Sequence, residues 1–275
     1  GEERFWAALN RLQPLAPQYV SITCGADGST RDRTPRLVTA LQGQGSLQVA
    51  PHLTCIGATR EDLVRIAHQY WDAGIRHMVA LRGDPPRGAA HYAPSGLAHA
   101  VDLVHALKSV GDFQISVAAY PETHPDAPNA QFDLVNLKRK VDAGAARAIT
   151  QFFFDTDVYL RFRDRCAAAG IAAGIVPGIL PITQLPQIAR LAQRCGASIP
   201  ARVQRHFEGL ESDHGTRQLI SASLAIEQVH ALQREGVDEF HFYTLNRAEL
   251  TYAACHALGV REVERSAALR PEVHA

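Results

Sequence analysis

Short apolar runs alternate with longer amphipathic segments along almost the whole chain. Seven such runs predict strands, at residues 19–24, 49–56, 78–81, 115–120, 148–154, 175–180 and 240–245. Each run is followed by a segment whose apolar residues recur at helical spacing. Because strict alternation of strands and helices favours a parallel sheet with right-handed crossovers, the pattern predicts an α/β protein of the (β/α)8 TIM-barrel class.

The predicted helices have recognisable ends. They span residues 2–13, 35–42, 60–73, 97–109, 130–143, 158–169, 185–194, 216–235 and 248–258, with a further short helix within 199–207. Thr59 is a typical N-cap for the third of these helices, and Gly74 is a typical stop signal at its other end. The chain contains no linker, low-complexity segment or repeat, so we expect one barrel domain over residues 1–275.

One strand of a closed barrel is not found. The chain opens directly with the helix at residues 2–13, and seven strands are counted where a TIM barrel has eight. We therefore expect that the first βα unit has lost its strand or that the recorded chain begins late, with the first strand upstream of Gly1.

Net charge and cysteine content indicate which binding partners and which cellular compartment to expect. The formal net charge is +0 and the pI is about 7.4, so we expect neither nucleic acid nor an anionic membrane as a partner. The cysteine count of 5 is odd and includes no Cys-x-x-Cys pair, which indicates free thiols in a reducing compartment and no metal site. No apolar run approaches the roughly 20 residues of a membrane span. We expect a cytoplasmic protein.

The first candidate for chemistry is Arg82-Gly83-Asp84, directly after the uncharged run at 78–81. In a TIM barrel the active site lies at the carboxyl ends of the strands, which is where this motif falls. Gly83 permits close approach of a ligand or of another backbone segment. The alternative is an ordinary surface ion pair in a loop.

Other polar groups follow the remaining strands. They are Thr23-Cys24-Gly25, residues 52–54, Tyr120-Pro121-Glu122 with His124, Gln151, Leu180-Pro181, and Tyr243 with Asn246-Arg247. Loops are generally polar, which explains much of this set. It explains less well Gln151, which lies between Thr150 and three consecutive phenylalanines where a purely structural core would be apolar. The set therefore predicts a site at one rim of the barrel.

The helix at 130–143 carries a second pattern. Asp133, Asn136 and Lys140 share one edge of the helical wheel, with Arg139 nearby. Two cations and an amide suit a pyrophosphate or a ribose, although a solvated helix face is the more common explanation. The chain has neither a Walker A motif nor Gly-x-Gly-x-x-Gly, so a dinucleotide would bind by other means.

Eight ordered motifs carry a family resemblance. They are Ala50-Pro51-His52-Leu53-Thr54-Cys55, Gly74-Ile75-Arg76-His77, residues 80–86, Ser116-Val117-Ala118-Ala119-Tyr120-Pro121-Glu122, residues 136–140, residues 149–155, Pro177-Gly178-Ile179-Leu180-Pro181 and residues 240–247. Together they resemble methylenetetrahydrofolate reductases of the bacterial type, over about residues 4–260.

The resemblance implies a barrel that holds FAD, takes hydride from NADH or NADPH, and reduces 5,10-methylenetetrahydrofolate to 5-methyltetrahydrofolate in ping-pong fashion. It implies flavin contacts at His52, Arg82, Gly83, Asp84, Ala100, Tyr120, His124, Asp133, Asn136, Arg139 and Lys140. It implies overlapping folate and nicotinamide contacts at Thr23, Asp84, Gln151, Gln187, Tyr243 and Arg247, with Asp84 as the catalytic residue. The helical pattern alone favours a solvated face for residues 130–143, whereas the resemblance implies that this face binds the flavin cofactor. We also expect a homo-oligomer.

Two departures from the family pattern accompany the resemblance. The family's proton-donating Glu lies on the first strand, and no residue of this chain matches it; Leu191 stands where some members have a ligand-stacking Phe. A non-catalytic flavin- or folate-binding barrel is therefore the main alternative, and a flavin-free barrel lyase is the third.

Overall fold

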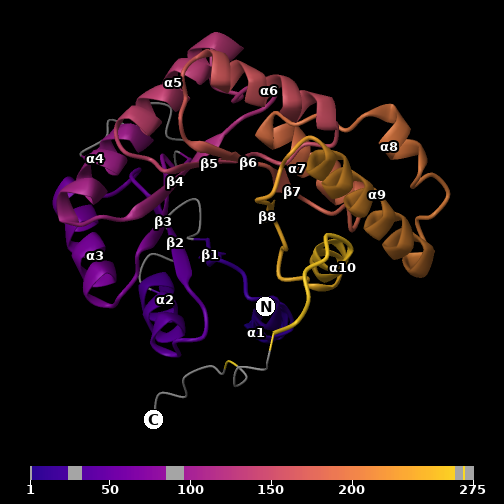
Figure 1. The fold of residues 1–275 in the computed structure, drawn as a ribbon, viewed down its shortest axis with the longest axis horizontal. Coiled ribbons are helices and arrows are strands. Elements are labelled where there is room, and N and C mark those ends of the chain that lie inside the picture. Colours follow the sequence, from indigo (N-terminus) through magenta and orange to yellow (C-terminus); the bar gives the residue numbers. More distant parts are fainter. Residues whose placement is uncertain (1, 24–32, 85–95, 264–268, 270–275) are drawn as a thin grey trace.

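A curved parallel sheet forms the centre of the molecule, and helices cover its outer side (Figure 1). The computed structural model describes residues 2–23, 33–84, 96–263 and 269. One sheet of 6 strands has the order β1 (Val20–Ile22), β2 (Val49–Thr54), β3 (His77–Leu81), β4 (Gln114–Ala119), β5 (Arg147–Thr150) and β6 (Gly174–Val176). A pair of strands, β7 (Gly178–Ile179) and β8 (His241–Phe242), continues the ring.

All seven predicted strands are present, with one correction. The run at 175–180 is divided at Pro177 into β6, which pairs with β5, and β7, which pairs with β8. Proline has no N–H to give to a ladder, so the strand changes partners at this residue. All recorded pairings are parallel, which confirms the α/β barrel class. Within the described residues no ladder joins β8 to β1.

Helices follow the strands as the sequence predicts. They are α1 (Glu2–Leu12), a 3-10 turn η1 (Gln13–Leu15), α2 (Arg33–Gly43), α3 (Arg60–Asp72), α4 (Ala100–Val110), α5 (Ala130–Asp142), α6 (Thr156–Ala168), α7 (Leu185–Cys195), α8 (Ala201–Arg205), α9 (His214–Arg234) and α10 (Glu249–Ala257). Thr59 caps α3 by accepting a hydrogen bond from the Asp62 N–H at 3.1 Å. Helix α4 begins three residues later than predicted, because the Asp102 carboxylate accepts the His99 N–H at 3.0 Å and makes His99 the N-cap.

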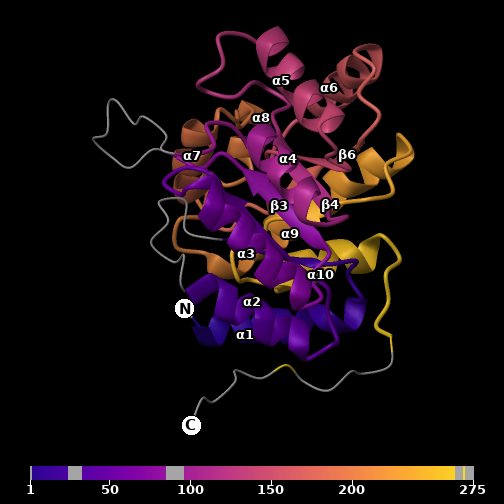
Figure 2. The same ribbon diagram turned by 90° about the vertical axis from the view of Figure 1, so that its left-hand side faces the viewer.

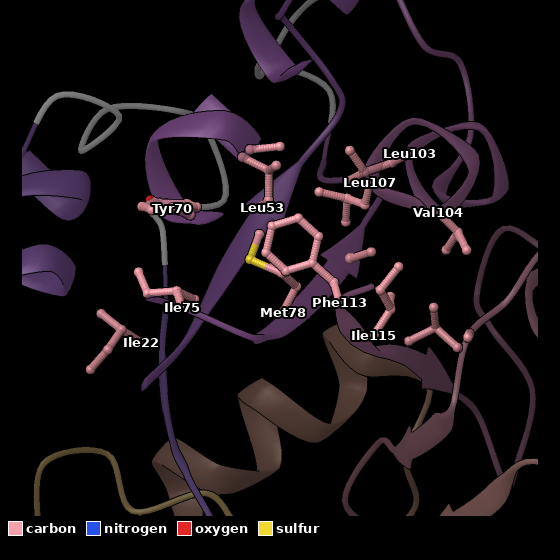
Figure 3. Close-up of a cluster of buried hydrophobic side chains, with 14 of the residues drawn as sticks. Ile22, Leu53, Tyr70, Ile75, Met78, Leu103, Val104, Leu107, Phe113 and Ile115 are labelled. Carbon is pink, nitrogen blue, oxygen red and sulfur yellow. The ribbon is translucent and has the colours of Figure 1, made fainter. Parts of the chain in front are cut away.

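The two faces of the sheet bury different side chains. Leu53, Met78 and Ile115 point outward and pack with Phe113 and Leu107 beneath the covering helices (Figure 3). A second cluster, Ala50, Val79 and Ile149, lies on the opposite face, inside the ring. Because successive residues of a strand point to opposite faces, this division determines which polar side chains face the interior.

The side view shows helices stacked along one wall of the ring, with α1 and α2 at one end and α5 and α6 at the other (Figure 2). None of the helices in the described part of the chain combines the length and apolar character needed to span a membrane.

Candidate active site

The turn at Arg82-Gly83-Asp84 is held closely against the end of β2. The Ile56 N–H donates to the Arg82 carbonyl at 2.9 Å. Gly83 has a φ of 85°, and a Cβ on it would lie 2.6 Å from Ile56 Cγ2 and 3.0 Å from Thr54 Cβ. Only glycine fits here without strain. The turn therefore places the Arg82 and Asp84 side chains on the rim, with Asp84 exposed.

We predict that Gly83→Ala lowers the free energy of unfolding by about 2 kcal/mol, because it combines left-handed strain with a steric clash. Gly45→Ala is the matched control: Gly45 has a φ of 71°, but nothing lies within 4 Å of the added methyl group. It should cost only about 1 kcal/mol. Urea unfolding of both variants measures the difference, and equal losses would show that the Gly83 turn accepts a side chain.

A chain of polar contacts joins Arg82 to the loop after β4. Arg82 Nη2 lies 2.7 Å from Asp126 Oδ2, and the Asp126 N–H donates to His124 Nδ1 at 3.0 Å. The His124 N–H in turn donates to Asp133 Oδ2, on α5, at 2.9 Å. Because Nδ1 of His124 accepts a hydrogen bond, the neutral ring carries its proton on Nε2. Three predicted residues, Arg82, His124 and Asp133, are thus brought together.

Tyr120 belongs to the same cluster. Its ring meets the His124 ring edge to face, with centroids 4.5 Å apart. Burial is the main reason why the pKa of Tyr120 is raised to about 12, with smaller contributions from Cys195 and from the carboxylates of Asp133 and Asp84. Tyr120 therefore stays protonated and presents a neutral hydroxyl and ring.

Helix α5 turns one cation inward and one outward. Lys140 Nζ donates to the Ala118 carbonyl at 2.6 Å, whereas Arg139 is exposed. Burial lowers the pKa of Lys140 to about 8, against the opposing effect of the Asp133 carboxylate. Asp133 and Asn136 are half-buried on the same edge. A purely solvated face does not describe this edge of the helix.

Two histidines face the interior of the ring. His52 lies two residues from the inward-facing Ala50, and its Nε2 atom is buried with no hydrogen-bond partner among the described residues. Burial, with a smaller effect from His241, lowers the pKa of His52 to about 3. Burial lowers the pKa of His241 to about 4. Both rings are therefore neutral near pH 7.

Sequence reasoning missed His241. Its neighbours Phe240 and Phe242 pack into the cluster beneath α9 and α10, so the alternation along β8 sends His241 to the opposite face. The period-two pattern Phe-His-Phe-Tyr was the available signal. Sequence reasoning also missed Asp126, a loop residue outside any regular pattern.

Tyr243 and Gln151 follow neighbouring segments of the ring. The Tyr243 hydroxyl donates to the Thr150 carbonyl at 2.9 Å, and burial raises the pKa of this tyrosine. A Cβ on Gly178 would lie 2.6 Å from Tyr243 Cε2, so the ring packs directly on this glycine. Gln151 is half-buried, and its Oε1 accepts the Phe152 N–H at 3.1 Å.

The remaining predicted residues occupy separate elements. Thr23 is exposed after β1, Gln187 is exposed on α7, Arg247 is half-buried after β8, and Ala100 is half-buried as the first residue of α4. Within the described residues, no side-chain hydrogen bond or ion pair joins these four residues to the polar cluster of Arg82, Tyr120, His124, Asp126 and Asp133. Only the motif residues Cys24, Gly25, Pro85 and Pro86 lie outside the described residues.

One cavity in the described part of the chain lies away from this rim. It measures about 560 Å³ and lies at the amino ends of the strands, near Gln114, Arg147 and Gly174. Arg147 is already paired there with Glu239 at 3.2 Å. A smaller hollow between Tyr120, Gln151 and Cys195 lies beside the polar cluster. Because the inward-facing histidines and the rim cluster lie toward the carboxyl ends, we place the site there despite the larger cavity elsewhere.

The comparison with known families decides what this site belongs to. The family model described as methylenetetrahydrofolate reductase matches residues 1–259. The chain belongs to the methylenetetrahydrofolate reductase family. The resemblance inferred from the sequence motifs is thereby confirmed.

Relatives with curated names agree. The chain is 54% identical to the 5,10-methylenetetrahydrofolate reductase of Escherichia coli over 260 residues, covering 94% of this chain and 86% of that protein. Identity to the Salmonella typhimurium protein of the same name is 55%, with the same coverage. Methylenetetrahydrofolate reductase (NADH) 1 of Arabidopsis thaliana is 36% identical, covering 90% of this chain and 44% of that protein. These names support methylenetetrahydrofolate reduction as the activity of the family.

A solved structure supports the fold. An uncharacterized protein from Clostridium thermocellum, described as binding two copies of 5-methyl-5,6,7,8-tetrahydrofolic acid, superposes with a TM-score of 0.59. It shares 14% identity and covers 94% of this chain and 89% of its own. At this identity the likeness concerns the fold alone.

Proposed function

We propose that residues 1–275 form one barrel domain of a flavoenzyme that reduces 5,10-methylenetetrahydrofolate to 5-methyltetrahydrofolate with NAD(P)H, the two substrates taking turns at one site. The observation that carries the proposal is the family match over residues 1–259, on a barrel whose rim gathers Arg82, His124, Asp133 and Lys140. Such a cluster suits an anionic dinucleotide cofactor.

The residues present fit FAD. His52 Nε2 is a buried polar atom without a partner among the described residues, as expected where a ligand completes the hydrogen bonding. Gly83 lets the turn pack against Ile56 and Thr54, which fixes the backbone that carries Arg82 and Asp84 toward the proposed cofactor. The proposed contacts are His52, Arg82, Gly83, Asp84, Ala100, Tyr120, His124, Asp133, Asn136, Arg139 and Lys140. Bound FAD would supply the hydride carrier between nicotinamide and folate.

The protein's own groups would bind and orient the substrates. In the proposal Gln151 pairs with the edge of the pterin, Arg247 binds a substrate carboxylate, and Asp84 stabilises positive charge that develops on the folate iminium. Thr23, Gln187 and Tyr243 complete the binding site. Because the Tyr243 hydroxyl is already bonded to Thr150, this tyrosine would contribute mainly its ring face.

The test uses the purified full chain loaded with FAD under anaerobic conditions. NADH or NADPH should bleach the oxidised-flavin absorbance, and 5,10-methylenetetrahydrofolate should then restore it. Bleaching without restoration would support a flavin-binding barrel that does not turn over folate. Failure to bind FAD at all would leave the flavin-free lyase alternative.

We predict that Lys140→Ala raises the Kd for FAD by about ten-fold or more, since it removes a charge-assisted contact worth roughly 1.5–3 kcal/mol. Arg139→Ala should weaken FAD binding less, because the Arg139 side chain is exposed. Lys138→Ala is the control: Lys138 lies on the same helix but is paired with Asp142 at 2.8 Å. Fluorescence titration with FAD measures all three, and unchanged affinity in the Lys140 variant would remove α5 from the cofactor site.

A further inference from the structure

Asp126 makes the only recorded salt bridge to Arg82 among the described residues. Its Oδ2 lies 2.7 Å from Arg82 Nη2, in a loop that connects β4 to α5. The Arg82 side chain is 35% exposed and the Asp126 side chain 64% exposed. The Arg82 Nε–H also donates a hydrogen bond to the carbonyl of the next residue, Gly83, at 3.3 Å.

Exposed ion pairs usually contribute little, because two long side chains must be held in one geometry. Here the Asp126 side chain is short, and hydrogen bonds fix the backbone that carries it. The Asp126 N–H donates to His124 Nδ1 at 3.0 Å, and the next N–H, of Ala127, donates to the His124 carbonyl at 2.9 Å. His124 is itself tied to Asp133 on α5. The carboxylate is therefore presented to Arg82 from a preorganised loop.

We propose that Asp126 is a positioning residue of the cofactor site, which holds the Arg82 guanidinium in the orientation that binds the anionic part of FAD. The inference rests on the proposed function, because it takes Arg82 as a cofactor contact. Arg82 Nη1 has no recorded partner among the described residues and is available to a phosphate oxygen. The carboxylate acts through Arg82 and does not itself bind the ligand.

Two effects of the Asp126 charge oppose each other. Its negative charge repels an anionic ligand, but water and salt screen an exposed charge over a Debye length of about 8 Å. Its hold on Arg82 removes part of the loss of side-chain entropy that binding would otherwise cost. We expect the second effect to dominate, so that losing the carboxylate weakens binding.

The experiment is a double-mutant cycle on FAD affinity, measured by flavin-fluorescence titration of the full chain freed of bound flavin. Asp126→Asn should raise the Kd about five-fold, and Asp126→Glu, which keeps the charge, should restore most of the affinity. In an Arg82→Gln background, Asp126→Asn should have no further effect. Asp142→Asn, which breaks a comparably exposed ion pair at the far end of α5, should leave the Kd unchanged.

The outcomes separate the inference from the function on which it rests. If Arg82→Gln binds FAD as tightly as the unmodified protein, the proposed cofactor site is misplaced. If Arg82→Gln weakens binding but Asp126→Asn leaves it unchanged or tightens it, the positioning role is wrong. Additive losses in the double variant would also overturn the inference, because Asp126 would then act independently of Arg82.

Discussion

Asp84→Asn is expected to slow the reduction of 5,10-methylenetetrahydrofolate by about 10²-fold while slowing flavin reduction by NADH far less. Asp84 directly follows the fixed Gly83 turn at the carboxyl end of β3, and its side chain is exposed on the rim. A carboxylate at this place favours positive charge, and in the proposed folate half-reaction positive charge would develop on the iminium. In the proposed site the same carboxylate would make it harder to add electrons to the neighbouring flavin, so its removal should slow flavin reduction far less than folate reduction.

Anaerobic stopped-flow measurements of the two half-reactions test this separation. The control is Asp112→Asn, because Asp112 is 85% exposed at the end of α4 and is paired with Lys108, away from the proposed site. The control should leave both rates unchanged. If Asp84→Asn also left both rates unchanged, Asp84 would not be part of the reacting site.

The second large effect concerns acid stability. The pKa values of His52 and His241 are lowered to about 3 and about 4 in the folded protein, from an ordinary value of 6.5. Below pH 6.5 the unfolded chain therefore binds protons that the folded protein does not bind. The free energy of unfolding falls as the pH falls through 6.5 and continues to fall until the folded-state values are reached. At pH 5 the expected loss is about 2 kcal/mol for each histidine, or about 4 kcal/mol in total.

Urea unfolding at pH 8 and pH 5 measures this loss. In each of the variants His52→Gln and His241→Gln, the free energy of unfolding lost between pH 8 and pH 5 should be smaller by about 2 kcal/mol, because one titrating group has been removed. The pKa of His77 is also lowered, by burial and by Arg147. His77 is present in the unmodified protein and in every variant, so its contribution cancels when their pH-dependent losses are compared. His68→Gln, on the exposed face of α3, is the control for substitution alone. An unchanged pH dependence in both interior variants would contradict the neutral buried pair.

The two predictions probe different parts of the same architecture. Asp84 is exposed on the rim, where its charge would reach a substrate bound at the proposed site, whereas His52 and His241 lie inside the ring, where burial keeps them neutral. A neutral imidazole offers a ligand one donor and one acceptor without a charge to desolvate. This division between a charged rim and an uncharged interior suits the successive binding of flat, polar ring systems proposed here.

The sequence by itself determined the barrel class, the seven strands and the rim that carries the candidate site. Apolar runs become strands wherever helices cover the sheet, and parallel strands bring their carboxyl ends together, so Arg82, Tyr120 and Gln151 could be assigned to one edge without coordinates. The ordered motifs also determined the family. Each of these inferences depends on local pattern or on the direction of the strands.

Only the tertiary structure decided which side chains meet and how deeply they are buried. Lys140 and Arg139 are adjacent on one helix, but packing against β4 turned only Lys140 inward, to the Ala118 carbonyl. Asp126 reaches Arg82 across 44 residues of sequence. The pKa of His52 is lowered by burial among segments remote in sequence, with a smaller effect from His241 on β8. Helical and strand periodicities specify faces, whereas pair contacts and desolvation arise only when segments remote in sequence close around a common interior.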